Sequence, residues 1–158
     1  MKKGFVKCVV VILGVLLCGL LCAKAKSLFR EEGKLLEILE INQDDIEHIV
    51  IAHYNSLRVV EDSNQKSKLT NMLNQNVAFN MKYNAENEGE SDWRIYLLLH
   101  TGEYLKLGVY DNGITFENKN KEYYYQGDFD LTVLEDVPKA ENPTKLRNEM
   151  KNYTKWKK

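Results

Sequence analysis

Apolar and polar residues alternate most regularly between residues 92 and 130, and this pattern predicts an antiparallel sheet. Four runs have the aromatic and aliphatic composition of half-buried strands. The predicted strands are 93–100, 104–110, 114–117 and 122–126. Because only short polar turns separate them, we expect a meander with one face buried and the other face in water.

One turn in this region carries a specific hairpin signal. Asn112-Gly113 lies between two alternating runs, directly after Asp111. Both residues tolerate positive φ, so the dipeptide is typical of a two-residue type I′ turn. The same triplet superficially resembles a calcium loop, but it lacks the alternating oxygen ligands and the closing glutamate. A hairpin therefore explains it better.

The preceding part of the chain predicts two more strands and a helix. The β-branched run 48–54 and the shorter run 58–61 indicate strands, joined by a turn at Asn55-Ser56. Asp62 or Ser63 stands where a helix N-cap is expected, and with Asp62 as the cap Gln65 falls three residues later. Apolar residues then recur at helical spacing and predict the helix face that covers the sheet. These residues are Leu69, Met72, Leu73 and Val77.

Less regular segments flank these elements. Residues 27–41 fit an amphipathic helix, and residues 36–41 fit an edge strand equally well. Residues 79–83 predict a strand, and 84–91 an exposed acidic loop. Residues 131–134 predict a last strand or a short packed segment. The expected fold class is α+β: a meander packed against one or two helices and preceded by an N-terminal hydrophobic helix.

The N-terminus predicts membrane targeting. A basic stretch at residues 1–7 precedes an unbroken apolar run of 16 residues, 8–23. This length lies between a signal-peptide core and a membrane-spanning helix. Ala23-Lys24-Ala25 fits cleavage after Ala25, whereas residues 5–23 are long enough to remain as an anchor, so both fates stay open. Lipoprotein processing is disfavoured, because bulky leucines precede Cys18 and Cys22.

Charge divides the chain into three parts, which match the expected organisation. Residues 1–30 carry six basic groups and no acid, residues 31–137 carry nine basic and 21 acidic groups, and residues 138–158 carry seven basic and two acidic groups. We therefore expect a targeting segment at 1–25, a folded extracytoplasmic domain at 26–137 and a basic tail at 138–158. An acidic body argues against nucleic acid as a partner.

The tail is expected to attach to an anionic surface rather than to belong to the fold. Pro138 and Pro143 interrupt the backbone after the sheet, and basic residues follow beside aromatic ones. This mixture suits anionic headgroups or wall polymers. The predicted contact residues are Lys151, Lys155, Trp156, Lys157 and Lys158. The alternative is that the tail folds back on its own acidic body.

No catalytic or metal motif stands out. His48 and His53 are an odd number of residues apart on one predicted strand, so their side chains project to opposite faces and cannot share a metal ion without a bulge. His100 ends another strand. All three cysteines fall within residues 8–22, which excludes a disulfide framework or a thiolate site elsewhere. No metal and no cofactor are expected.

Tyrosine is the one residue in excess, with nine in the chain. Aromatic clusters on a sheet bind sugars or peptides, and they also arise from ordinary cross-strand packing. The tyrosines that define this predicted surface are Tyr96, Tyr104, Tyr110, Tyr123, Tyr124 and Tyr125. Both interpretations remain open at this point.

The order of elements also resembles a known kind of protein. A targeting segment, the stretch 44–51, a capped helix and a tyrosine-rich meander ending at residues 123–127 are similar to small exported or membrane-anchored domains of unknown function from Gram-positive bacteria. The resemblance covers residues 35–136 and implies an extracytoplasmic location. It transfers no catalytic residues.

These observations lead to two functional expectations. The first is a non-enzymatic binding or accessory domain of the cell envelope, held at the membrane or secreted, with an envelope protein or a wall polymer as partner. The second is a secreted hydrolase, or an inhibitor of hydrolases, that uses an acidic site around Asp128 and Asp130.

Overall fold

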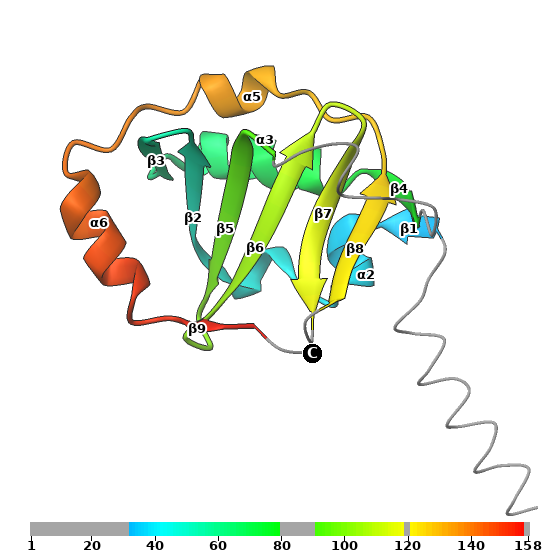
Figure 1. The fold of residues 1–158 in the computed structure, drawn as a ribbon, viewed down its shortest axis with the longest axis horizontal. Coiled ribbons are helices and arrows are strands. Elements are labelled where there is room, and N and C mark those ends of the chain that lie inside the picture. The colour runs from blue at the N-terminus through cyan, green and yellow to red at the C-terminus, as the bar shows by residue number, and fades with distance from the viewer. Residues whose placement is uncertain (1–31, 80–90, 119–120, 157–158) are drawn as a thin grey trace, which may run out of the picture. The chain divides into compact units, whose positions relative to one another are not determined.

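The four strands with the clearest alternation form the centre of one large sheet (Figure 1). The computed structural model describes residues 32–79, 91–118 and 121–156. Its central strands are β5 (Trp93–Leu99), β6 (Glu103–Tyr110), β7 (Gly113–Asn118) and β8 (Lys121–Gln126). Each is antiparallel to the next, which confirms the predicted antiparallel sheet and the α+β class.

Further strands extend the sheet on both sides. They are β1 (Glu32–Lys34), β4 (Asn76–Phe79), β2 (Ile46–His53) and β3 (Ser56–Val60). The order across the sheet is β1-β4-β8-β7-β6-β5-β2-β3. A short strand near the C-terminus, β9 (Thr154–Lys155), pairs in parallel with β6. The register places Ile49, Ile51 and His53 on one face of β2, and His48 and Val50 on the other.

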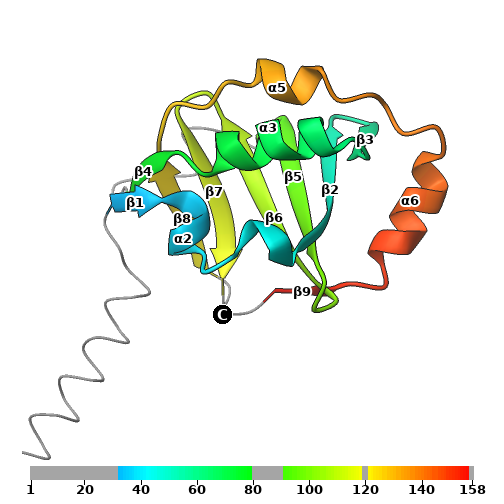
Figure 2. The ribbon, with the colours of Figure 1, turned by 180° about the vertical axis from the view of Figure 1, so that it is seen from behind.

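One face of the sheet carries the main hydrophobic core. The helices α3 (Ser63–Leu73) and α2 (Leu35–Ile38) lie against this face (Figure 2). Leu69 and Leu73 of α3 are fully buried together with strand residues such as Ile51, Ile95 and Leu107. The apolar residues of α3 thus pack on alternate positions of the strands, which confirms the predicted covering helix for Leu69, Met72 and Leu73. Val77, which was expected on the same helix face, lies in β4 instead.

The beginning of α3 follows the sequence signal closely. Asp62 is the N-cap, and its Oδ1 accepts the backbone N–H groups of Asn64 at 2.9 Å and Gln65 at 3.0 Å. Two of the donors that a helix leaves without an intrahelical partner are thereby satisfied.

The opposite face of the sheet is partly covered by the C-terminal segment. Here α6 (Pro143–Met150) and the residues after it pack beside β2, β3 and β5. Leu146, Met150 and Tyr153 contact a second cluster built on Val50 and Leu98. Residues 143–156 are therefore part of the folded body, which corrects the expectation of a tail outside the fold; the alternative, that the segment folds back, is what the structure shows.

The connection between β8 and α6 runs over one end of the sheet through α5 (Thr132–Glu135) (Figure 1). It is the short packed segment that the sequence allowed, since Leu134 is fully buried. Arg58 of β3 holds the C-terminal end of α5 in place, because its guanidinium donates to the carbonyls of Glu135 and Val137. The same guanidinium lies 5.7 Å from the centroid of the Trp93 ring.

Two local expectations need correction. The loop between β6 and β7 is Asp111-Asn112, with Tyr110 paired to Gly113, and neither Asn112 nor Gly113 has positive φ. The hairpin exists, but it is not the type I′ turn that Asn-Gly predicted. At the first hairpin the loop is Tyr54-Asn55 rather than Asn55-Ser56.

At the start of the described chain, β1 is followed directly by α2. The helical interpretation of residues 27–41 is confirmed only over 35–38, and the predicted edge strand at 36–41 is wrong, because these residues form the rest of α2 and the turn after it. The predicted strand at 79–83 begins earlier, at Asn76, and its last four residues lie outside the described ranges. The targeting segment at 1–25 and most of the acidic loop at 84–91 also lie outside them. Among the residues that the structure describes, none of the helices has the length and apolarity needed to cross a membrane.

Candidate functional site

A groove of about 1140 Å³ lies between α6 and the β2–β3 end of the sheet. We call it the α6 groove. It is bounded by α6 and Tyr153 on one side, by the first residues of β2 and α3 on the other, and by residues 138–142 at one end. Its apolar lining includes Val59, Leu98 and Leu146. Such a mixture of apolar surface and a few polar groups is typical of binding sites.

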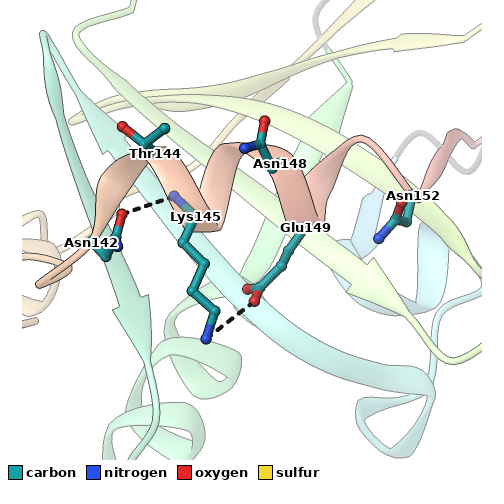
Figure 3. A pocket seen from close by; sticks show the side chains of 6 residues that line it. All are labelled: Asn142, Thr144, Lys145, Asn148, Glu149 and Asn152. Atoms are coloured by element: carbon teal, nitrogen blue, oxygen red, sulfur yellow. Dashed lines mark hydrogen bonds and ion pairs between the residues drawn. The ribbon is translucent and has the colours of Figure 1, made fainter.

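The α6 wall is built from a short, well-capped helix. Asn142 is its N-cap and accepts the backbone N–H of Lys145 at 2.9 Å, and Pro143 occupies the first helical turn, where a missing N–H costs nothing. Lys145 pairs with Glu149 one turn later, at 3.7 Å (Figure 3). Asn142, Lys145, Glu149 and Asn152 line both the α6 groove and a smaller pocket of about 460 Å³.

Glu47 is the centre of a polar cluster in this groove. Its Oε2 accepts a hydrogen bond from the Tyr153 hydroxyl at 2.8 Å. His48 Nε2 lies 3.8 Å from Oε1, and His100 Nδ1 lies 4.0 Å from Oε2. The strand register shifts between Ile46 and His48, and an irregularity of this kind re-aims a side chain. One carboxylate thus meets groups from β2, from the β5–β6 turn and from the C-terminal segment.

The groups around Glu47 are suited to hydrogen bonding. Burial, followed by the hydrogen bond to Glu47, raises the pKa of the Tyr153 hydroxyl, so it remains a donor at neutral pH. His48 and His100 are exposed and supply further donors and acceptors. Within the described ranges, no three histidine, cysteine or acidic side chains are placed to hold a metal ion.

The predicted tyrosine surface is split between the two faces of the sheet. Tyr123 and Tyr125 lie on the core side and stack against Phe116, with ring centroids 5.3 and 5.8 Å apart. On the other face, Tyr96 and Tyr104 lie 6.1 Å apart beside the C-terminal segment. The six tyrosines therefore do not form one continuous patch.

The two remaining tyrosines of the predicted set, Tyr110 and Tyr124, lie in β6 and β8. Tyr124 is buried and donates its hydroxyl hydrogen bond to the carbonyl of Asn112 at 3.0 Å. Tyr110 is half-buried in β6 and pairs with Gly113. None of the six tyrosines lines the α6 groove.

The predicted anionic-surface residues are also divided. Lys155 Nζ lies 2.8 Å from Glu117 Oε2, and Trp156 packs against the main core. Lys151 is exposed and donates to the side chain of Asn148 at 3.0 Å. Lys157 and Lys158 lie outside the described residues. All three of these residues that the structure describes thus contact the protein itself, Lys155 and Trp156 at the sheet and Lys151 at α6.

Three other candidates from the sequence, Asp128, Asp130 and His53, do not line the α6 groove. Asp130 Oδ1 accepts both the N–H and the hydroxyl hydrogen bond of Thr132, so it orients the start of α5. Asp128 is exposed and does not line the α6 groove. His53 stacks on Trp93 with ring centroids 3.8 Å apart, on the face opposite His48, as the spacing predicted.

The contact between the C-terminal segment and the sheet predicts a response to acid. The Lys155 ammonium, by its hydrogen bond and its charge, holds the pKa of Glu117 below its usual range. A carboxylate with a lowered pKa stabilises the folded state above its unfolded pKa, and this contribution is lost as the pH falls through the folded value. We therefore expect β9 to be held less firmly below about pH 4.

Amide hydrogen exchange at Trp156 measures this effect, because its N–H bonds to the carbonyl of Tyr104. After correction for intrinsic exchange, opening should increase between pH 5 and pH 3. The substitution Lys155→Met should abolish most of that increase. An equal increase in this variant would show that the Glu117–Lys155 pair is not responsible.

Sequence reasoning did not identify the α6 groove or the role of Glu47. Tyr153 and Glu47 are 106 residues apart, so no spacing rule connects them. The usable signals were individual: a glutamate beside a histidine before a strand, and apolar residues in a basic C-terminal segment. Comparisons with protein-family models, with curated proteins and with solved structures find no match to this chain.

Proposed function

We propose that this protein is a non-enzymatic binding domain of the cell envelope that holds its ligand in the α6 groove. The observation that supports the proposal is the groove itself: about 1140 Å³, with apolar surface from Leu98 and Leu146 beside the Glu47 cluster. Apolar surface supplies affinity in such a site, and a few placed polar groups supply orientation.

The polar lining suits a ligand with both hydrogen-bonding and charged groups. Lys66 is already engaged, because its Nζ donates to the carbonyl of Ile46, and Lys145 is paired with Glu149. Glu47 retains accepting capacity beside the Tyr153 hydroxyl, since a carboxylate accepts several hydrogen bonds. We infer that a polypeptide of the envelope is the partner that matches this mixture.

The envelope location belongs to the same proposal. The apolar run at 8–23 and the basic residues before it favour export, with the N-terminal helix either removed after residue 25 or kept as a membrane anchor. An intact-mass measurement of the mature protein separates these fates. A chain beginning at Lys26 supports cleavage, a full-length chain supports the anchor, and an acylated Cys22 would contradict both.

Site-specific photo-crosslinking in intact cells tests the groove. A photoreactive amino acid replaces Asn152, which lines the groove and is exposed. We expect one defined crosslinked species, identified by mass spectrometry. A matched control carries the same amino acid at Asp128, which is exposed and lies outside the groove. Equal crosslinking at both positions, or none at Asn152, would contradict the proposal.

A charge exchange on α6 provides a second control. In the double variant Lys145→Glu with Glu149→Lys the pair along the helix is retained, while the charges facing the groove change places. Thermal stability should change by less than about 2 °C, because exposed pairs contribute little. The yield of the crosslinked species should nevertheless fall several-fold, because a partner in the groove contacts these two charges. If the α6 groove were instead a catalytic site, the substitution Glu47→Gln would abolish turnover of its substrate.

A further inference from the structure

Tyr54 occupies a backbone position that does not suit tyrosine. It is the first of the two loop residues between β2 and β3, and its φ is 50°. Residues other than glycine rarely adopt this left-handed region, and among them asparagine does so most easily. A tyrosine here works against the preference of the turn. Packing does not account for it, because the Tyr54 side chain is 72% exposed.

The Tyr54 ring is nevertheless held in one orientation. Its hydroxyl donates to Asp92 Oδ2 at 2.8 Å, and the ring lies 4.4 Å from the ring of His53, centroid to centroid. His53 stacks in turn on Trp93, which is buried in the core. An exposed aromatic ring with a fixed orientation loses less conformational entropy on binding than a mobile one. Among the described residues, Tyr54 is the one large hydrophobic side chain that is mostly exposed.

The chemistry beside the ring favours a cation. The face of a tyrosine ring attracts an ammonium or guanidinium group through its quadrupole, and the Asp92 carboxylate lies at the hydroxyl end of the same ring. Asp92 is exposed, so its oxygens remain accessible to a second donor. Residues 31–158 carry a net charge of −7, from 16 basic and 23 acidic groups, which attracts a basic partner over a longer range.

We propose that Tyr54 and Asp92 form a recognition site for an arginine or lysine side chain of a polypeptide partner. The cation lies over the exposed face of the ring and pairs with the carboxylate. This inference is independent of the proposed function of the α6 groove, because neither residue lines that groove. The loss of one site leaves the other testable.

A ligand titration of the full-length chain in neutral detergent micelles tests the proposal. The tyrosines are labelled with fluorine, and the Tyr54 resonance is assigned by its absence in Tyr54→Phe. The probes are N-acetylargininamide and N-acetylcitrullinamide, which have nearly the same shape but differ in charge. We expect the arginine probe to shift the Tyr54 resonance at millimolar concentration and to bind about 5- to 10-fold more tightly than the citrulline probe.

Two variants separate recognition from a structural role. Asp92→Asn should weaken the arginine probe about 3- to 5-fold and leave the citrulline probe unchanged. Tyr54→Asn removes the ring but suits the positive φ, so the melting temperature should not fall. In this variant the arginine probe should no longer shift the fluorine resonances of neighbouring tyrosines. These results together would establish the site.

Three outcomes would overturn the proposal. Equal affinity for the two probes would show that the positive charge of the probe does not contribute to binding. A melting temperature lowered by many degrees in Tyr54→Asn would show that the ring is retained for stability. A Tyr54 resonance that moves with salt but not with the arginine probe would show that basic residues of the chain itself already occupy the site.

Discussion

Truncation after Val137 should lower the melting temperature by roughly 10 °C. The deletion removes Leu146, Met150 and Tyr153 from the second cluster and exposes part of Val50 and Leu98. A fully buried apolar side chain contributes about 1.5–3 kcal/mol, and the three removed side chains are only partly buried. Their loss, with that of β9, therefore corresponds to about 3–5 kcal/mol, which is on the order of 10 °C for a chain of this size. Calorimetry of the purified variants measures the change.

A shorter truncation is the matched control. Removal of Lys157 and Lys158 alone takes away two positive charges and leaves the contacts of Tyr153 and Trp156 intact. Its melting temperature should stay within about 1 °C of the full chain, because exposed charges contribute little. If both truncations melt like the full chain, the C-terminal segment contributes no stability and the packing against Val50 and Leu98 is energetically irrelevant.

The same pair of variants bears on the anionic-surface hypothesis, which stays a prediction. Lys155 is paired with Glu117 and Trp156 packs against the core, so surface attachment by these two residues would compete with the fold. We therefore expect binding to anionic vesicles to depend chiefly on Lys151, Lys157 and Lys158. Each such charge contributes about 1 kcal/mol at most, and less at higher salt.

Local patterns were sufficient to predict most of the sheet. Alternation from Tyr104 to Tyr110 depends on the two-residue period of a strand, which is the same wherever the strand lies in the fold. The N-cap at Asp62 is local in the same way, since its partners lie two and three residues later. Such features do not require knowledge of the tertiary structure.

The candidate site could not be predicted in the same way, because its residues meet only after folding. Glu47 meets His48 and His100 within the sheet, but its contact with Tyr153 spans 106 residues and depends on where α6 packs. That packing depends in turn on the apolar surface around Val50 and Leu98 on the second face of the sheet. The spacing of residues in the C-terminal segment does not show which surface of the sheet the segment will contact.

Gly113 shows how a correct local signal can have a different physical cause. Asn-Gly correctly predicted a hairpin, but the glycine does not have the positive φ of a type I′ turn. A Cβ at Gly113 would instead lie less than 3.0 Å from the ring and hydroxyl of Tyr124. That ring is 5% exposed and is held by its hydrogen bond to the Asn112 carbonyl. Glycine is required here because another side chain passes close to its Cα.

The substitution Gly113→Ala should therefore destabilise the protein by about 2–3 kcal/mol, because the Tyr124 ring must leave its site or the strands must separate. This change corresponds to a fall in melting temperature of roughly 5–10 °C. Gly102→Ala is the contrasting control. Gly102 has φ of 80° with open space around its Cα, so alanine there meets backbone strain but no neighbour, and a smaller loss of about 1 kcal/mol is expected.

Gly113→Asn distinguishes the two explanations directly. If the position needed positive φ, asparagine would be tolerated nearly as well as glycine. Because the obstacle is the Tyr124 ring, asparagine should be at least as destabilising as alanine. A double-mutant cycle then identifies the ring: Tyr124→Ala is destabilising by itself, but Gly113→Ala added to it should cost less than about 1 kcal/mol, giving a coupling energy of about 1–2 kcal/mol. If the costs of the two substitutions add, the close approach of Tyr124 is not the reason for glycine at this position.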